Sequence, residues 1–384
     1  MSNILQSIRT MFAPIKPLPA GIYHYISPAD DPRNYRLHLR LENDGSGILI
    51  LNASSILHLN QSAAEYAYYI LQNRPVDEVS RIVASRYHVT TDSARKDYLD
   101  LIDRIQILIN TPDLDPETFL DFQRKPAHQG YISAPYRLDC AITYRLSDGI
   151  DPALAPIDRV KSELSTSQWK VILDKAWDVG IPHIVFTGGE PTLRPDLIEL
   201  ISYAQLKGQV AGLISNGLRL GDRAFITALL QSGLDHLMLT YHPEFEQSWK
   251  ILTDLLMEDL FIAVHLTITQ RNVNQILSEI KRLSDAGVQA VSLSTDDPNL
   301  HEKLNDACNL IASHHIELVW NLPVPYSTFN PVSLETSRAG YSGGVGRDWL
   351  YVEPDGDVLP GQGVNQVLGN FINSSWEQIW KNRS

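Results

Sequence analysis

From residue 137 onward the sequence repeats one pattern, a short β-type run of apolar residues followed by a helical stretch. The β-type runs lie at 138–143, 183–187, 210–214, 236–240, 261–268, 289–294 and 316–320. The first intervening helix begins with a capping box formed by Ser165 and Gln168. Repeated β-then-α units predict a parallel sheet. We therefore expect an α/β domain over residues 136–325, a barrel or partial barrel with its chemistry at the carboxyl ends of the strands.

Residues 35–110 are predicted to form a smaller α+β unit. Strand-like runs come first and helical periodicity follows, with strands at 35–40, 48–51 and 55–59 and helices that begin near Asn60, Pro75 and Thr91. The sequence therefore predicts three strands followed by three helices.

Three segments flank these two units. Residues 1–34 form an N-terminal segment, and residues 111–135, which are rich in proline and show little periodicity, indicate a linker. Residues 326–384 form a C-terminal extension that contains a hairpin around the turn Pro354-Asp355-Gly356.

Composition excludes several classes of protein. The 384 residues include 32 Lys and Arg against 45 Asp and Glu, a net charge of −13, which disfavours nucleic acid as a partner. The two cysteines, Cys140 and Cys308, cannot build a disulfide framework or a thiolate zinc site, and they favour a reducing, cytoplasmic compartment. We expect no membrane association, because no apolar run reaches the ~18 residues of a membrane span.

The second β-type run of the barrel ends in Thr187-Gly188-Gly189-Glu190-Pro191. Two glycines let the backbone approach a ligand, and the carboxylate of Glu190 could accept an amine. The alternative is a tight β-to-α turn with a helix-capping glutamate. The segment resembles the radical S-adenosylmethionine (SAM) superfamily, whose partial (β/α)6 TIM-type barrels use this motif to hold the amino group of SAM. The resemblance implies that Gly188, Gly189, Glu190 and Pro191 bind SAM.

The loop after the first barrel strand departs from that family. Family members carry C-x3-C-x2-C there, because three thiolates bind three irons of a [4Fe–4S] cluster. The register of this chain places Leu146, Ile150 and Ala153 at those positions, and none of these side chains can bind iron. Cys140 lies inside the preceding strand, where we interpret it as a small buried apolar residue. We expect no iron–sulfur cluster, no metal site and no radical chemistry.

Other strand ends keep the resemblance. Ser215-Asn216-Gly217 is similar to the family's Thr-Asn-Gly turn, and Thr240 follows a strand whose end meets the ribose or carboxylate of SAM in the family. Thr267 and Thr269, near the fifth strand, are secondary candidates. Ordinary hydrogen bonding at strand ends is the alternative for these side chains. His242, in the loop after the fourth strand, could act as a base, but we interpret it as a surface histidine.

The C-terminal block resembles the SPASM or twitch extensions of peptide-modifying radical SAM enzymes. It has a hairpin, then Leu368-Gly369-Asn370, then a helix that ends at Trp380. Such extensions bind auxiliary clusters through cysteines, one of them after Leu-Pro in the hairpin. This chain has Pro360-Gly361 there, so we expect no auxiliary cluster.

The unit at 35–110 resembles PqqD-like domains, which are winged-helix-like and bind leader peptides of ribosomally made, modified peptides. In that family the leader adds a strand beside the third strand and packs on the third helix. The resemblance implies a peptide-binding set of Ile56, Leu57, His58, Tyr98, Ile102 and Ile105. The alternative is that these residues fill the core of the unit.

Three hypotheses for function follow. The first is a catalytically degenerate radical-SAM-like scaffold that presents a leader or precursor peptide to a radical SAM partner with a full set of cysteines. The second is an enzyme that still binds SAM, weakly, or another nucleotide, and does polar chemistry such as methyl transfer. The third is a relic that binds nothing.

Overall fold

The computed structural model describes residues 15–111, 114–120, 122, 131–314, 316–337 and 343–383. The chain divides into two compact units, Met1–Ile132 and Ser133–Ser384. The beginning of the predicted N-terminal segment and most of the predicted linker at 111–135 lie outside the described residues.

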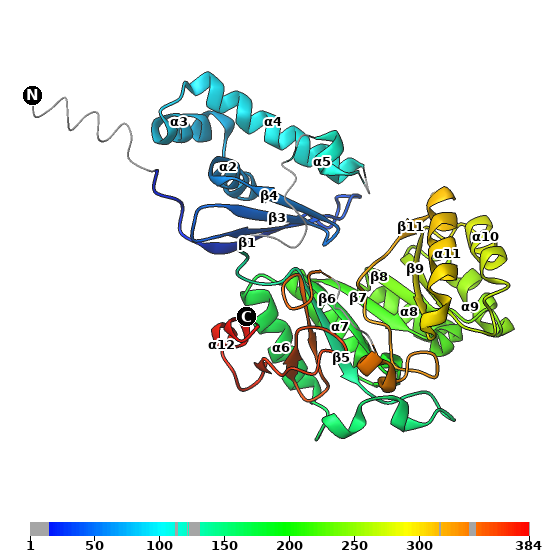
Figure 1. The fold of residues 1–384 in the computed structure, drawn as a ribbon. Helices are drawn as coiled ribbons and strands as arrows, with labels where there is room; N and C mark the ends of the chain where they lie inside the picture. Colours follow the sequence, from blue (N-terminus) through cyan, green and yellow to red (C-terminus); the bar gives the residue numbers. More distant parts are fainter. Residues whose placement is uncertain are drawn as a thin grey trace, which may run out of the picture. The chain divides into compact units, whose positions relative to one another are not determined.

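The first unit contains an antiparallel sheet in the order β1-β2-β3-β4. Its elements are β1 (Gly21–Ile26), β2 (Arg36–Leu41), β3 (Gly47–Leu51), β4 (Ser55–Leu59), α2 (Gln61–Leu71), α3 (Val76–Tyr87), α4 (Thr91–Asn110) and the short α5 (Pro116–Phe119). The helices lie on one side of the sheet, and leucines at alternate positions of the strands pack against them (Figure 1).

The predicted helix starts of this unit agree with the structure. The side chain of Asn60 caps α2 by accepting a hydrogen bond from the Ala63 amide, and Thr90 caps α4 in the same way from Ser93. The prediction of three strands was wrong, because it left out β1. The run Ile22-Tyr23-His24-Tyr25-Ile26 has the composition of a strand, and the signal was available in the sequence.

The second unit is an α/β structure around one mostly parallel sheet in the order β11-β10-β9-β8-β7-β6-β5-β12-β13-β14. The parallel strands are β5 (Arg137–Thr143), β6 (His183–Gly188), β7 (Val210–Ser215), β8 (His236–Thr240), β9 (Phe261–Ile268), β10 (Ala290–Thr295) and β11 (Glu317–Leu318). The intervening helices are α6 (Thr166–Asp178), α7 (Leu197–Lys207), α8 (Arg223–Gln231), α9 (Glu246–Leu255), α10 (Ile276–Asp285) and α11 (His301–Ser313). The predicted α/β class is confirmed.

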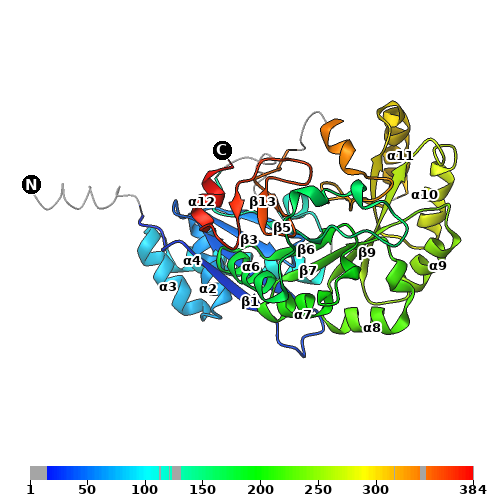
Figure 2. The same cartoon turned by 90° about the horizontal axis from the view of Figure 1, so that it is seen from below.

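From β5 to β11, strands that are neighbours in the chain are also neighbours in the sheet, and the helices lie along its outer side (Figure 2). This singly wound order is consistent with a partial barrel. Side chains of five strands form an apolar layer, Val185, Ile214, Met238, Ala263 and Ala290. The carboxyl ends of these strands therefore meet beyond a packed core.

The C-terminal extension continues the sheet of the barrel. β12 (Trp349–Val352) pairs in parallel with β5, and β13 (Asp357–Leu359) and β14 (Gly369–Asn370) extend the sheet antiparallel before α12 (Trp376–Lys381). The predicted hairpin is present, and it is joined to the first barrel strand.

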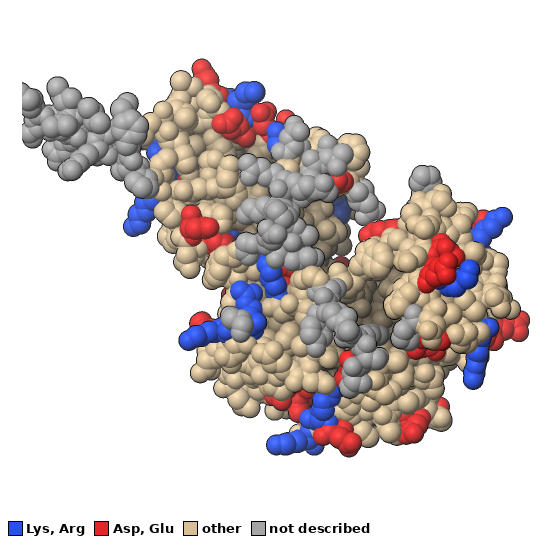
Figure 3. Space-filling view, viewed as in Figure 1, with Lys and Arg blue, Asp and Glu red and all other residues tan. Residues whose placement is uncertain are grey.

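The surface carries charges of both signs. On the face drawn in Figure 3, Lys and Arg side chains are interspersed with Asp and Glu. Within the described part of the chain, no helix combines the length and the apolar character that crossing a bilayer requires.

Candidate functional site

A pocket of about 1190 Å³ lies at the carboxyl ends of the barrel strands. Loops after β5, β6, β7, β8, β9 and β10 contribute to it, together with residues 325–329. In open and closed parallel sheets this end of the strands is where ligands bind.

The two glycines of the motif allow a close approach between two loops. A Cβ atom would lie 2.2 Å from the Thr143 carbonyl oxygen at Gly188 and 2.3 Å from the Arg145 carbonyl oxygen at Gly189. Instead, the Gly189 amide donates to Thr143 O at 2.9 Å and the Glu190 amide donates to Arg145 O at 2.8 Å. Glycine is required here because the motif docks against the loop after β5.

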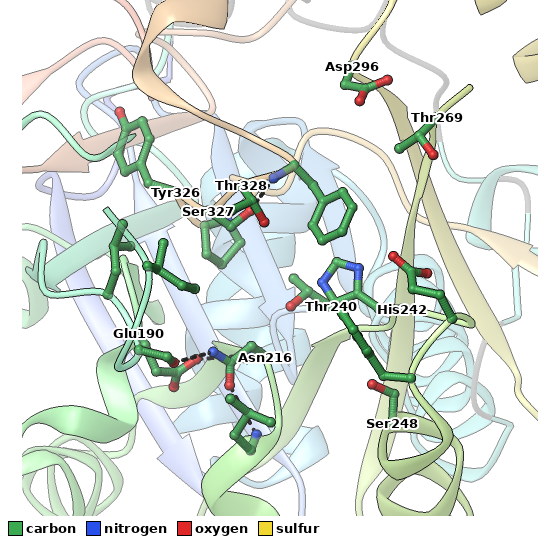
Figure 4. A pocket seen from close by; sticks show the side chains of 18 of the residues that line it. Glu190, Asn216, Thr240, His242, Ser248, Thr269, Asp296, Tyr326, Ser327 and Thr328 are labelled. Atoms are coloured by element: carbon green, nitrogen blue, oxygen red, sulfur yellow. Dashed lines mark hydrogen bonds between the residues drawn. The ribbon is translucent and has the colours of Figure 1, made fainter. Parts of the chain in front are cut away.

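The Glu190 carboxylate links the turns after β6 and β7. Its Oε1 atom accepts from the Thr192 amide (3.0 Å), the Thr192 hydroxyl (2.6 Å) and the Ser215 hydroxyl (2.9 Å). Its Oε2 atom accepts from the Asn216 amide at 2.8 Å (Figure 4). Burial raises the pKa of Glu190, and these hydrogen bonds oppose the rise. Glu190 therefore caps the following turn and also lines the pocket.

The structure divides the predicted SAM-binding residues into two groups. Gly189, Glu190, Asn216 and Thr240 line the pocket. Gly188, Pro191, Ser215 and Thr267 do not line it. The Ser215 hydroxyl donates a hydrogen bond to Glu190, and the Thr267 hydroxyl lies 3.2 Å from the Ser294 hydroxyl on the next strand. Ser215 therefore contacts a residue of the pocket, whereas the Thr267 hydroxyl bonds to the neighbouring strand.

His242 lines the pocket and is half-buried, so it is more enclosed than the surface histidine that we expected. Its ring stacks on Phe329 with centroids 4.2 Å apart and an interplanar angle of 23°. Burial lowers the pKa of His242, which favours the neutral imidazole, and the charge of Glu244 opposes this shift. The sequence could not reveal this contact, because Phe329 comes from the distant segment 325–329.

The residues present do not fit a [4Fe–4S] cluster. Leu146 and Ile150 line the pocket, and Ala153 lies in the turn η1 (Pro152–Leu154). Cys140 is fully buried in β5, where burial raises the pKa of its thiol, and Cys308 lies on α11. Within the described residues, no group of three or more His, Cys, Asp and Glu could hold a metal ion. Apolar side chains and one isolated buried thiol cannot replace three thiolates.

The loop after β5 is instead held by ion pairs to the C-terminal part of the unit. Arg159 donates to both oxygens of Glu335, at 3.0 and 2.9 Å, and lies 3.7 Å from Glu353. Tyr144 and Tyr326 donate to Glu353 and Glu335, respectively. These contacts hold the loop that carries Leu146 and Ile150, and no local sequence pattern predicts them.

In the first unit, the structure separates the predicted peptide-binding residues. Ile56, Leu57 and His58 lie on β4, at one edge of the sheet. Tyr98, Ile102 and Ile105 lie on α4 and line a pocket of about 300 Å³ together with Tyr25 of β1 and Tyr35 and Leu37 beside it. Leu57, Tyr98 and Ile105 are core residues, as the alternative expected, whereas Ile56, His58 and Ile102 are half-buried. The β4 residues do not line the α4 pocket.

Sequence comparison relates the second unit to known enzymes. Residues 140–242 match the Radical SAM superfamily. A PqqA peptide cyclase of Bradyrhizobium diazoefficiens is 25% identical over 258 residues, 59% of this chain and 67% of that protein. A PqqA peptide cyclase of Gluconobacter oxydans is 35% identical over 111 residues, 28% of this chain and 31% of that protein. The chain thus has a radical SAM domain and is homologous to PqqA peptide cyclases.

Structural comparison extends the likeness to most of the chain. The crystal structure of Streptococcus suis SuiB bound to its precursor peptide SuiA has a TM-score of 0.59 at 14% identity, covering 93% of this chain and 88% of SuiB. SuiB bound to S-adenosylmethionine gives a TM-score of 0.57, also at 14% identity, with the same coverage of both chains. At this level of identity the likeness concerns the fold.

Proposed function

We propose that this protein binds a ribosomally made precursor peptide and takes part in its modification without a [4Fe–4S] cluster of its own. One observation carries the proposal. A radical SAM domain homologous to PqqA peptide cyclases has Leu146, Ile150 and Ala153 in the loop where the family binds its cluster. Without the cluster, the protein presents the peptide to a radical SAM partner that has the full set of cysteines.

The three predicted parts have separate roles in this proposal. Residues 35–110 act as a PqqD-like, winged-helix-like domain that binds the leader. Residues 136–325 form the radical-SAM-like barrel. Residues 326–384 form a twitch-like extension, and its Glu335 and Glu353 form ion pairs with Arg159 in the loop after β5. The fold of SuiB, a protein that binds its precursor peptide, supports this division.

The pocket favours a second candidate, an enzyme that binds SAM and does polar chemistry such as methyl transfer. In the described part of the chain, Glu190 Oε2 accepts one hydrogen bond, which leaves room for the ammonium group of SAM. Gly189, Asn216 and Thr240 would hold the rest of the molecule. When bound, SAM would supply an electrophilic methyl group.

Peptide binding is tested with fluorescently labelled precursor peptides encoded beside this gene. We expect at least one to bind the full chain with a Kd below ~100 μM, measured by anisotropy. Adding the protein to a cysteine-complete radical SAM partner should then raise the yield of modified peptide in mass spectrometry. If no neighbouring peptide binds the well-folded protein, the proposed role is wrong.

The same mixtures distinguish a peptide-presenting scaffold from an enzyme that uses SAM. Incubation of peptide, SAM and this protein alone should leave the peptide mass unchanged if the protein is a scaffold. A mass increase of one methyl group, dependent on Glu190, would instead establish the polar enzyme.

A further inference from the structure

A histidine and two serines form a hydrogen-bonded group on the inner face of β9 and β10. His265 follows Ala263 by two residues on β9, and Ser292 and Ser294 follow Ala290 at the same spacing on β10. Because side chains alternate along a strand, all three share the face that carries the apolar layer of the barrel. They therefore lie inside the barrel, nearer to the carboxyl ends of the strands than that layer.

Each ring nitrogen of His265 has a serine hydroxyl within hydrogen-bond distance. The Nδ1 atom lies 3.1 Å from Ser292 Oγ, and the Nε2 atom lies 3.0 Å from Ser294 Oγ. The imidazole tautomer with its proton on Nδ1 donates to Ser292 and accepts from Ser294. In that tautomer the Nε2 atom can take the proton of Ser294, as a general base does with a nucleophilic hydroxyl.

The group adjoins the pocket at the barrel mouth. His265 is opposite Thr240 in the register of β8 and β9, and Thr240 lines the pocket. Asp296, two residues after Ser294, also lines it. His265 and Ser292 are buried, with exposed fractions of 2% and 7%, whereas Ser294 is half-buried. Of the three side chains, that of Ser294 is therefore the one most open to a substrate.

Burial of the ring does not by itself account for Ser294. A buried imidazole needs hydrogen-bond partners, and Ser292 supplies one at Nδ1. The Thr267 hydroxyl, which is 5% exposed, lies 3.4 Å from Nε2 and could satisfy that atom within the core. The shorter contact to Nε2 is nevertheless made by the more exposed serine. This is the arrangement that a base and its nucleophile require.

We propose that Ser294 is a nucleophile that accepts an acyl group from a carboxylic ester, with His265 as its general base. The Ser294 proton moves to His265 Nε2, the Oγ atom bonds to the carbonyl carbon, and the bond from that carbon to the leaving alcohol breaks. The alcohol departs with the proton from Nε2. Water then attacks the acyl-serine in the same way, which releases the carboxylic acid and restores the serine. This activity goes beyond the proposed function and does not depend on it.

The test uses the full chain and 4-nitrophenyl acetate, which releases coloured 4-nitrophenolate when its acetyl group is transferred. We expect an acetyl group on Ser294, located by peptide mass spectrometry after an acid quench. Release should be at least about tenfold faster than with Ser294→Ala. Acetylation confined to other residues, or equal release from Ser294→Ala, would overturn the inference.

Two further variants test the base. His265→Gln should slow acetylation of Ser294 at least about tenfold, because it removes the proton acceptor. Ser278→Ala removes an exposed serine of α10 outside the pocket and should change nothing. Circular dichroism checks that each variant is folded. A folded His265→Gln that is acetylated at the wild-type rate would overturn the inference.

Ser292 acts through His265 and is a positioning residue. Ser292→Ala should slow acetylation of Ser294, and Ser292→Thr, which keeps the hydroxyl, should restore the rate. This pair carries the test of the base if His265→Gln does not fold, and equal rates in the two variants would then overturn it. Because the ester probe contains no peptide, failure of peptide binding leaves these measurements unaffected, and failure of acetylation leaves the proposed function standing.

Discussion

The Nε2 atoms of His183 and His236 lie 2.7 Å apart, although these residues begin strands β6 and β8, which are not neighbours in the sheet. β7 runs between them, and its Gly212 is opposite His236 in the strand register. A Cβ atom at Gly212 would lie 2.1 Å from His236 Cε1. The histidine pair therefore depends on the missing side chain at Gly212.

Gly212→Ala should destabilise the second unit by about 1–3 kcal/mol, because the added methyl group displaces the packed, half-buried ring of His236. Urea unfolding followed by tryptophan fluorescence measures this, since all 7 tryptophans of the sequence lie after residue 132. Gly221→Ala is the matched control, because the nearest atom to its Cβ would be at 3.7 Å, an ordinary contact. Equal stability of the two variants would show that the ring moves away without cost.

The His183–His236 pair should also make the stability of the protein depend on pH. Burial lowers the pKa of His236 to about 4 and lowers that of His183 well below its usual value. In the unfolded chain these rings bind protons below about pH 6.5, whereas in the folded chain they stay neutral. The free energy of unfolding should therefore fall as pH drops from about 6.5 towards 4, by up to about 1.4 kcal/mol per pH unit for each histidine.

Denaturation curves between about pH 7 and pH 4 check this sign. In the double variant His183→Gln/His236→Gln, the free energy of unfolding should depend less on pH, because the contribution of the two histidines is gone. An unchanged slope in the variant would assign the acid sensitivity to other groups.

Glu190→Ala should abolish SAM binding. For the wild type we expect a Kd of ~10–100 μM, because two cysteines are too few for the three thiolates of the family's cluster, which we expect to be missing as an anchor for SAM. The variant also loses four hydrogen bonds at a buried site, so its melting temperature must be measured alongside. Thr267→Ala, outside the pocket, should keep wild-type affinity. Undetectable binding of SAM to the wild type at millimolar concentration would exclude the enzyme candidate.

Anaerobic reconstitution with iron and sulfide should leave the protein colourless. Cys140 is buried and Cys308 is on α11, so the chain cannot supply three convergent thiolates. Iron analysis and absorption spectroscopy provide the measurement. A stoichiometric four-iron spectrum would contradict the expected absence of a cluster.

Local sequence patterns predicted the strands and helices well because hydrophobic periodicity and capping act over a few residues. Asn60, Ser165 and the Gly-Gly-Glu-Pro turn are examples. The sequence did not predict contacts between segments that lie far apart in the chain. The stacking of His242 on Phe329 and the ion pairs of Arg159 with Glu335 depend on the path of residues 325–337 over the barrel mouth. No local pattern encodes that path.

The predicted peptide-binding set shows a second limit of the sequence. Apolar residues on a strand and on a helix fit both a groove and a core, and only tertiary packing decides between them. Leu57 belongs to the core, Ile105 belongs to the core and also lines the pocket beside β1, and the half-buried Ile102 lines that pocket.

Ile102→Glu should therefore weaken binding of a precursor peptide by more than about 1 kcal/mol, because it replaces an apolar contact surface of the α4 pocket with a charge. Ile107→Glu is the matched control, since Ile107 is on the same helix, is 42% exposed and does not line that pocket. Both variants should keep the wild-type circular dichroism spectrum, and anisotropy with labelled peptide compares their affinities. If Ile102→Glu unfolds the unit, Ile102 is a core residue. If both folded variants bind like the wild type, the peptide uses another surface, such as the edge of β4.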